Sequence, residues 1–144
     1  MDRKGAVMTI LPFLISDYDE VYTLWKATPG VGLSSADSRE AIAAYLEYNP
    51  GLSFVARDGD HLVGAVLCGT DGRRGYLHHL AVDPDFRRQG AGQALVEHCL
   101  AGLKELDIEK CHLFVMESNI AGREFWQHIG WRLRSDLLIL STDT

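Results

Sequence analysis

The sequence has few cysteines, and neither its cysteines nor its histidines show spacing typical of a metal site. Its three cysteines, Cys68, Cys99 and Cys111, are an odd number without short paired spacing, and its six histidines show no zinc-type spacing either. Disulfide frameworks and structural zinc sites depend on such pairs. We therefore expect the cysteines to be buried small apolar side chains, and we expect no bound metal.

The chain also lacks an excess of positive charge and a long apolar run. Its formal net charge is -6, which argues against broad nucleic-acid binding, because that binding depends on clustered Lys and Arg. No apolar stretch approaches the ~18 residues needed to cross a bilayer, and Met1 to Lys4 leads into no signal-peptide core. We expect no nucleic-acid partner, no membrane association and a cytoplasmic location.

No linker, repeat or low-complexity segment divides the chain. A length of 144 residues fits one domain, since domains typically hold ~100 to 200 residues. A hydrophobic content of 47% and a charged content of 24% are ordinary for a globular protein. We therefore expect residues 1–144 to form a single domain.

Strand-like and helical patterns alternate along the sequence, separated by turn residues. In chain order they predict a strand at 9–13, helices at 16–28 and 38–48, strands at 53–57, 61–70 and 76–82, a helix at 93–106, a strand at 110–116, a helix at 119–129, and strands at 131–134 and 137–140. This pattern predicts an α/β (α+β) fold in the order β-α-α-β-β-β-α-β-α-β-β. Its mixed, mostly antiparallel central sheet would hold about seven strands flanked by four helices.

A glycine-containing segment joins the predicted strand at 76–82 to the helix that follows it. The segment reads Arg87-Arg88-Gln89-Gly90-Ala91-Gly92 and continues into Gln93. The first N–H groups of a helix carry partial positive charge and have no partner within the helix, and glycines at 90 and 92 let an anion approach the backbone. The segment therefore predicts a pyrophosphate-binding loop. The alternative is a solvated turn with basic side chains before an ordinary helix.

Two other nucleotide-binding motifs do not fit this loop. A Walker-type loop needs Lys and then Ser or Thr after its last glycine, whereas Gln93 and Ala94 follow Gly92. A dinucleotide fingerprint needs a third glycine, and Leu95 occupies its position. What remains resembles the Arg/Gln-x-x-Gly-x-Gly/Ala motif of the GCN5-related N-acetyltransferase (GNAT) superfamily, which uses acetyl-CoA.

Two further segments carry the same resemblance in the same order. Leu80-Ala81-Val82-Asp83-Pro84 precedes the loop, and Asn119-Ile120-Ala121-Gly122-Arg123-Glu124-Phe125-Trp126 with Gly130-Trp131 resembles the second motif of the superfamily. The match covers residues from about 53 to 134, and the predicted order of elements is the GNAT arrangement. Asn119 is also a natural helix N-cap, and the aromatic residues are also natural core residues.

The resemblance implies an acetyl-CoA site between two strands. The strands at 76–82 and 110–115 would separate at their C-terminal ends, and the pantetheine arm would enter there and bind the backbone of Leu80, Ala81 and Val82. The pyrophosphate would meet the N–H groups from Arg88 to Gln93, with charge added by Arg87 and Arg88. Asn119 and Trp126 would complete the cofactor site, which needs no metal.

Direct attack of an amine on the thioester requires a base and a donor to the thioester oxygen. The resemblance assigns the donor to the backbone N–H of Leu80, and a base or its water relay to Tyr76 and His78. Strict alternation along a strand would place Tyr76, His78 and Leu80 on one face and His79 on the other, packed against a helix. His78 is the expected base, because imidazole accepts a proton near neutral pH. The alternative is a purely structural His78.

Trp126 stands where many members of the superfamily have a tyrosine that protonates the leaving sulfur. An indole N–H donates a hydrogen bond but cannot act as a general acid. The loss is tolerable in an enzyme, since a thiolate leaves without much help. It also fits an acyl-CoA-binding sensor or pseudoenzyme. A third possibility is an unrelated α/β fold with accidental motifs.

The sequence says least about the acceptor. In this superfamily the acceptor is set by the first two helices, their connecting loop and the last strand pair, here Trp25 to Leu33, Tyr45 and the Ser135-Asp136 turn. Trp25 and Tyr45 are candidates to line a pocket, although core packing explains them equally well. The resemblance implies a primary amine acceptor, on a small molecule or a peptide, and dimers are common among relatives.

Overall fold

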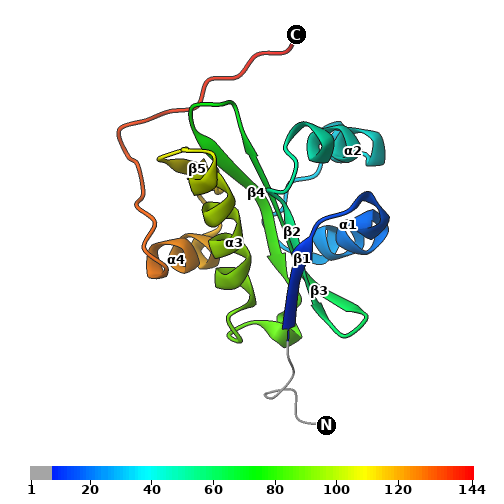
Figure 1. Cartoon of the computed structure of the whole chain (residues 1–144). Coiled ribbons are helices and arrows are strands. Elements are labelled where there is room, and N and C mark those ends of the chain that lie inside the picture. The colour runs from blue at the N-terminus through cyan, green and yellow to red at the C-terminus, as the bar shows by residue number, and fades with distance from the viewer. Residues whose placement is uncertain (1–7) are drawn as a thin grey trace. The chain divides into compact units, whose positions relative to one another are not determined.

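The structure, a computed structural model that describes residues 8–144, contains one mixed sheet flanked by helices (Figure 1). The expectation that the chain has no signal peptide depends on Met1 to Lys4, and these residues lie outside the described part of the chain. The five strands are β1 (Met8–Pro12), β2 (Phe54–Asp58), β3 (His61–Thr70), β4 (Gly75–Val82) and β5 (Cys111–Leu113). They lie in the sheet in chain order, antiparallel except for the parallel pair of β4 and β5.

The predicted helices are all present. They are α1 (Tyr18–Ala27), α2 (Arg39–Tyr48), α3 (Ala91–Glu105) and α4 (Ile120–His128), and short 3-10 turns occur at η2 (Ile15–Asp17), η3 (Ser35–Asp37) and η4 (Pro84–Phe86). The α+β architecture with four helices is therefore confirmed. The chain divides into two compact units, one ending at Phe114 and one covering Val115–Thr144, and each is described by itself below.

The sheet has fewer strands than the sequence predicted. Residues 131–134 and 137–140, predicted as a strand pair, form no strand, although the turn between them is present at Ser135 and Asp136. An apolar segment becomes a strand only when another strand satisfies its backbone N–H and C=O groups. No such pairing forms in Val115–Thr144, and Leu138 and Leu140 are 92% and 95% exposed.

Local side-chain signals explain where several elements begin and turn. The sequence Asp58-Gly59-Asp60 between two strand-like runs favours a hairpin, and Gly59 in the turn between β2 and β3 has the positive φ, 59°, that such a turn needs. The Ser38 hydroxyl accepts a hydrogen bond from the N–H of Ala41 at 3.2 Å and caps α2. The first long helix begins later than predicted, because Ser16 lies within η2 and Asp17 is the residue before α1.

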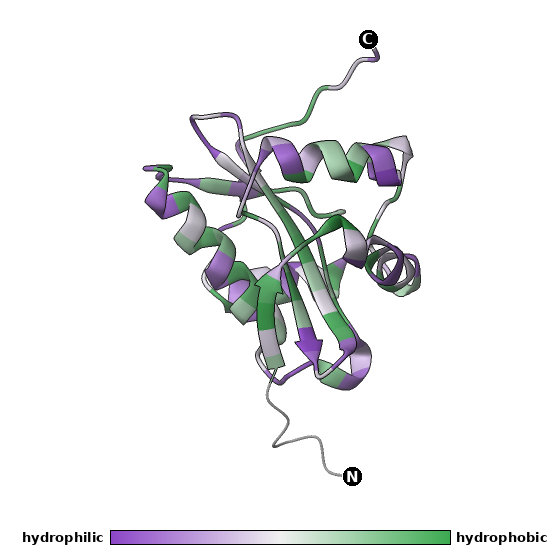
Figure 2. Cartoon of the chain, turned by 45° about the vertical axis from the view of Figure 1, so that its right-hand side comes forward, coloured by the Kyte–Doolittle hydropathy of each residue, from purple (hydrophilic) through white to green (hydrophobic). Residues whose placement is uncertain are grey.

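One face of α3 supplies the core on its side of the sheet. The sequence period places Leu95, Val96, Cys99, Leu100, Leu103 and Leu106 in one apolar stripe, and of these Leu100 at 37% and Leu106 at 54% exposure are not buried. Figure 2 shows the same division, with green strands in the middle of the sheet and helices banded in green and purple. The helix is therefore amphipathic, as its sequence period predicts.

The three cysteines are free thiols in the structure. Cys68 and Cys99 are buried, Cys111 is half-buried, and burial raises the pKa of Cys111 to about 12. Within residues 8–144, no cluster of three metal-ligating side chains occurs and no helix is long and apolar enough to cross a membrane.

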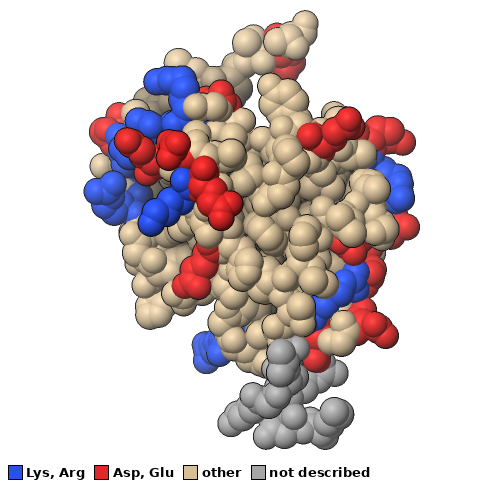
Figure 3. Space-filling view, in the orientation of Figure 1, with Lys and Arg blue, Asp and Glu red and all other residues tan. Residues whose placement is uncertain are grey.

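On the face shown in Figure 3, basic side chains lie among acidic ones. Among the ion pairs of the described residues, Arg57 Nη2 lies 2.8 Å from Asp17 Oδ1.

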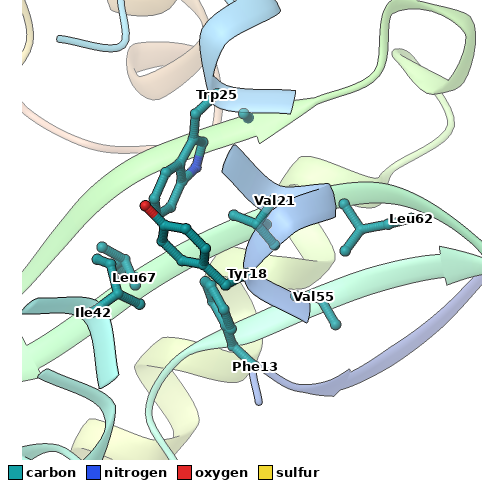
Figure 4. Close-up of a cluster of buried hydrophobic side chains, with 10 residues drawn as sticks. Phe13, Tyr18, Val21, Trp25, Ile42, Val55, Leu62 and Leu67 are labelled. Atoms are coloured by element: carbon teal, nitrogen blue, oxygen red, sulfur yellow. The ribbon is translucent and has the colours of Figure 1, made fainter. Parts of the chain in front are cut away.

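A second core lies between the sheet and the helices α1 and α2. Figure 4 shows aromatic and aliphatic side chains of α1, including Tyr18, Val21 and Trp25, facing Phe13 and the strand residues. Val21 and Trp25 are completely buried. Trp25 is therefore a core residue, which was the alternative to lining the acceptor pocket. This core matters for function because β4 contributes to it beside its candidate catalytic residues.

Candidate active site

The candidate site is built around the second half of β4. Only Gly75, Tyr76 and Leu77 pair with β5, opposite Cys111, His112 and Leu113. From His78 to Val82, β4 has no strand partner on that side within the unit that ends at Phe114. The pairing of these two strands thus stops where the expected separation begins, and the backbone edge beyond it faces no neighbouring strand.

A β-bulge interrupts β4 at the same place. Leu67 pairs with His78 and Ala65 with Ala81, so β4 carries one residue more than β3 between these pairs. His79 has a φ of 53°, in the left-handed region that histidine adopts more readily than most residues. Neither His79 nor Leu80 has a register partner in a neighbouring strand of the described chain.

The bulge overturns the expected alternation of the two histidines. The His78 ring lies 6.3 Å from the Tyr45 ring of α2, and the His79 ring lies 5.0 Å from the Trp25 ring of α1. His79 does pack against a helix, as expected, but on the same side of the sheet as His78. The extra residue shifts the pleat by one position, so strict alternation no longer holds beyond His78.

The surroundings of His78 favour its neutral form. Its imidazole is half-buried between Tyr45 and His79, and burial is the main cause that lowers its pKa from the ordinary value of 6.5. The charge of His79 lowers the pKa further, while Asp37 acts in the opposite direction. At neutral pH this side chain is therefore an unprotonated imidazole, the form that accepts a proton.

The other predicted catalytic residues also lie on β4. Tyr76 is half-buried, and its ring lies 5.9 Å from the ring of His112 in β5. Leu80 is half-buried next to the bulge, and Ala81 belongs to the core beneath α1. The structure thus brings Tyr76, His78 and the Leu80 backbone together on one strand.

The segment between β4 and α3 has the backbone conformation of an anion cradle. Arg88 has a φ of 64° and Gly90 a φ of 84°, and α3 begins at Ala91, earlier than predicted. The first helical hydrogen bond runs from the N–H of Ala94 to the carbonyl of Gly90 at 2.9 Å. Left-handed residues of this kind turn successive N–H groups toward one concave surface, where an anion binds.

The donors of this cradle are free to bind an anion. Within the described residues, the N–H groups from Arg88 to Gln93 have no hydrogen-bond partner, and no acidic side chain occupies the first turn of α3. The loop itself is held by side chains, since Arg87 Nε donates to the Val82 carbonyl at 3.3 Å and Gln89 Nε2 to the Asp85 carbonyl at 3.2 Å. These residues therefore fit a pyrophosphate group.

Two predicted cofactor residues belong to the second unit, Val115–Thr144. The Asn119 side chain accepts a hydrogen bond from the N–H of Gly122 at 3.0 Å and caps α4. The half-buried Trp126 ring contacts Phe125 and Trp131 at centroid distances of 5.2 and 4.9 Å. The indole N–H of Trp126 has no partner among the hydrogen bonds of residues 8–144, so it remains an available donor.

The class of this protein follows from its similarity to known proteins. The acetyltransferase (GNAT) family matches residues 18–131, so the chain belongs to the GNAT family of N-acetyltransferases, which transfer acetyl groups from acetyl-CoA. It is 35% identical over 114 residues to an acetyltransferase of Pectobacterium atrosepticum, covering 79% of this chain and 80% of that protein. An acetyltransferase of Sodalis glossinidius is 29% identical over 133 residues, 92% of this chain and 93% of that one.

Solved structures show the same fold at low sequence identity. Ard1 from Thermoplasma volcanium superposes with a TM-score of 0.79 at 22% identity, covering 89% of this chain and 84% of that one. AAC(6')-Iy, solved in complex with the bisubstrate analog CoA-S-monomethyl-acetylneamine, has a TM-score of 0.77 at 16% identity, covering 96% of this chain and all of that one (100%). The GNAT fold predicted from the sequence is confirmed.

Sequence reasoning missed one residue beside the candidate base. The sequence presents Asp37 only as a helix cap, whereas its carboxylate lies 2.9 Å from His79 Nε2. The distance of 42 positions along the chain explains why, since no short-range pattern predicts such a contact. Tyr45, which the sequence already offered as a pocket residue, has a buried hydroxyl without a hydrogen-bond partner within the described residues.

Proposed function

We propose that this protein transfers the acetyl group of acetyl-CoA to a primary amine by direct attack within a ternary complex. One observation carries the proposal: the bulged, unpaired half of β4 leads into an open cradle of backbone donors at the start of α3. A strand edge suits the amide groups of a pantetheine arm, and a helix start suits a pyrophosphate.

The cofactor-binding roles follow from this arrangement. The N–H groups of Arg88, Gln89, Gly90, Ala91, Gly92 and Gln93 would hold the pyrophosphate, with charge from Arg87 and Arg88. The backbone of Leu80, Ala81 and Val82 would bind the pantetheine arm. Asn119 and Trp126 would be further cofactor-binding residues, and the proposed reaction uses no metal.

The catalytic roles belong to β4. The Leu80 N–H would donate to the thioester oxygen, and preorganised donors of this kind contribute about 3 kcal/mol in other enzymes. His78 would remove a proton from the incoming amine, directly or through a water relay that includes Tyr76. The lowered pKa of His78 supports this role, because a neutral imidazole is the form that can accept that proton.

The departing thiolate needs little help from the protein. Its ordinary pKa lies near ~8.5 if cysteine is taken as a guide, so its protonation is not essential for departure. Trp126 would donate a hydrogen bond to the sulfur or pack against the pantetheine arm. It would not supply a proton.

The proposed acceptor is an uncharged primary amine on a small molecule or a peptide. Structural neighbours described as an aminoglycoside acetyltransferase and as the ribosomal-protein-S18-alanine N-acetyltransferase of Escherichia coli represent both types. We further propose a cytoplasmic protein without nucleic-acid or membrane partners. We also propose a homodimer, because Leu137 to Leu140 expose a continuous apolar run that a second copy of the chain would cover.

A thiol-release assay tests the proposed reaction. Acetyl-CoA would be offered with amines, polyamines, amino acids and peptides, and the products would be identified by intact mass. We expect acceptor-dependent release of CoA together with a mass gain of one acetyl group on the acceptor. Release of CoA without acetylated product from any acceptor would contradict the proposal.

One observation favours a second function, an acyl-CoA-binding sensor without catalysis. It is the replacement of the usual general-acid tyrosine by Trp126. Calorimetry separates the two functions when combined with the thiol-release assay. Tight acetyl-CoA binding without product across the whole acceptor panel would favour the sensor.

A further inference from the structure

The bulge in β4 is held from outside the strand by α1 and η3. Trp25 Nε1 donates a hydrogen bond to the His79 carbonyl at 3.0 Å, and the edge of one ring meets the face of the other at a centroid distance of 5.0 Å. His79 Nε2 lies 2.9 Å from Asp37 Oδ1. Backbone and side chain of this left-handed residue are thus both fixed, which offsets the strain of its φ.

Asp37 is itself held in place for this contact. Its side chain is only 7% exposed, and its second carboxylate oxygen accepts a hydrogen bond from the Ser34 N–H at 3.0 Å. Its backbone carbonyl accepts a hydrogen bond from the Tyr18 hydroxyl. A buried carboxylate is stable only when it is paired and hydrogen-bonded, and His79 is the one ionisable side chain paired with it among the described residues.

The titratable groups that face His78 come from three elements. Tyr45 contacts it from α2 at a ring distance of 6.3 Å, His79 lies next to it in β4 at 6.5 Å, and Asp37 acts on it from η3. The groups facing His79 are Asp37 and His78. A positive charge on His79, beside Asp37, opposes a second positive charge on His78.

We propose that His79 and Asp37 are positioning residues for acetyl transfer: their contact fixes the bulge that directs His78. This inference rests on the proposed role of His78 as the base. It adds a second histidine and a buried carboxylate to the site, and neither of them touches the reacting atoms.

The test is a His79→Gln variant, which retains an amide that can donate to Asp37 but carries no charge. We expect the titration midpoint of His78, followed by NMR of its imidazole protons, to rise. Two unit charges separated by the observed 6.5 Å predict a rise between about 0.5 and about 2 pH units, for effective dielectric constants of about 80 and 20. The acid limb of kcat/KM should move upward by the same amount.

Asp37→Asn provides the complementary variant. This variant removes the contact of His79 with Asp37. It also removes the negative charge of Asp37, which raises the pKa of His78. The loss of the contact and the loss of the charge should change the pKa of His78 in opposite directions. We expect a smaller shift of the His78 midpoint than in His79→Gln, and a double variant whose shift differs from the sum of the single shifts. His79→Asn, which tolerates the left-handed backbone, replaces His79→Gln if the latter does not fold.

His61→Gln is the matched control. It also removes a histidine paired with an aspartate, since His61 Nε2 lies 3.4 Å from Asp83 Oδ2, but it lies at the start of β3. It should leave the His78 midpoint unchanged. An unchanged midpoint in a folded His79→Gln variant would overturn the inference. A wild-type protein without acetyl transfer would instead overturn the proposed function, because the NMR titration is independent of activity.

Discussion

At the scale of single residues, the environment of His78 decides what this strand can do. Half-burial and the neighbouring His79 lower the pKa of His78, so it is neutral over the pH range in which a base is needed. Its neighbour has the opposite surroundings, a buried carboxylate at 2.9 Å. Two adjacent histidines thus have different partners because a bulge interrupts the strand beside them.

The pH dependence of activity should show this. We expect kcat/KM to fall on acidification with a midpoint below 6.5, the ordinary histidine pKa, because the base is active only above its lowered pKa. The measurement is a pH–rate profile of the wild type and of His78→Ala. An unaltered profile in His78→Ala would identify His78 as structural.

Trp126 allows a second prediction at this scale. We expect Trp126→Phe to lower turnover by less than about tenfold, because an indole supplies no proton and loss of a true general acid costs ~100-fold or more. Trp131→Phe is the matched control, since it alters the same aromatic pair from the other side. A loss of several orders of magnitude only in Trp126→Phe would contradict this interpretation.

At the scale of elements, the start of α3 is the part most open to attack by a single substitution. Gly90 has a φ of 84°, and a side-chain carbon added to it would meet no atom within 4 Å, so the position faces open space beside the free N–H groups. A carboxylate there would occupy the cradle and repel an anion. The helix behind it would remain packed through Leu95 and Val96.

Gly90→Asp should therefore abolish acetyl-CoA binding while the protein stays folded. Isothermal calorimetry gives the affinity, and circular dichroism checks the fold. Gly90→Asn is the matched control for backbone strain, because asparagine has nearly the same shape without the charge. Unchanged affinity in Gly90→Asp would show that the pyrophosphate binds elsewhere.

The contact of β4 with α3 gives a prediction about stability. An added methyl group at Gly75 would lie 2.4 Å from Leu103 Cδ1, whereas one at Gly32 would meet nothing within 4 Å. We expect Gly75→Ala to lower the free energy of unfolding by about 1 to 3 kcal/mol, since overpacking forces a shift in the core. Urea denaturation of Gly75→Ala and Gly32→Ala tests it, and equal stability of the two would refute it.

At the scale of the whole molecule, the unit Val115–Thr144 is too short to hold a core of its own. Its Leu138 and Leu140 are almost fully exposed, and we have proposed a second copy of the chain as their cover. The single domain predicted from the sequence remains a prediction, and the unfolding transition is the way to test it.

We expect one cooperative unfolding transition. Trp25 reports on the first unit, and Trp126 and Trp131 report on the second. In the double variant Trp126→Phe, Trp131→Phe, tryptophan fluorescence reports on Trp25 alone. The unfolding midpoint from this fluorescence should equal the midpoint that the near-ultraviolet signal gives for the wild type, once the change in stability caused by the two substitutions is subtracted. Separate transitions for the two units would show two domains.

Local patterns determined much of this protein. Hairpin residues around Gly59, the Ser38 cap and the period of α3 act over a few positions, so the order of elements and the loop from Arg87 to Gln93 were predictable. The same reasoning placed Tyr76, His78 and Leu80 on one strand. It failed at 131–140, because apolar composition specifies a strand only if a partner strand is available.

Tertiary structure alone decided the chemistry around His78. The left-handed His79, the contact from Asp37, the hydrogen bond from Trp25 and the point at which β4 and β5 cease to pair all depend on residues far apart in the chain. Such contacts form only after the helices pack on the sheet, and only packing can stabilise a strained bulge and a buried carboxylate.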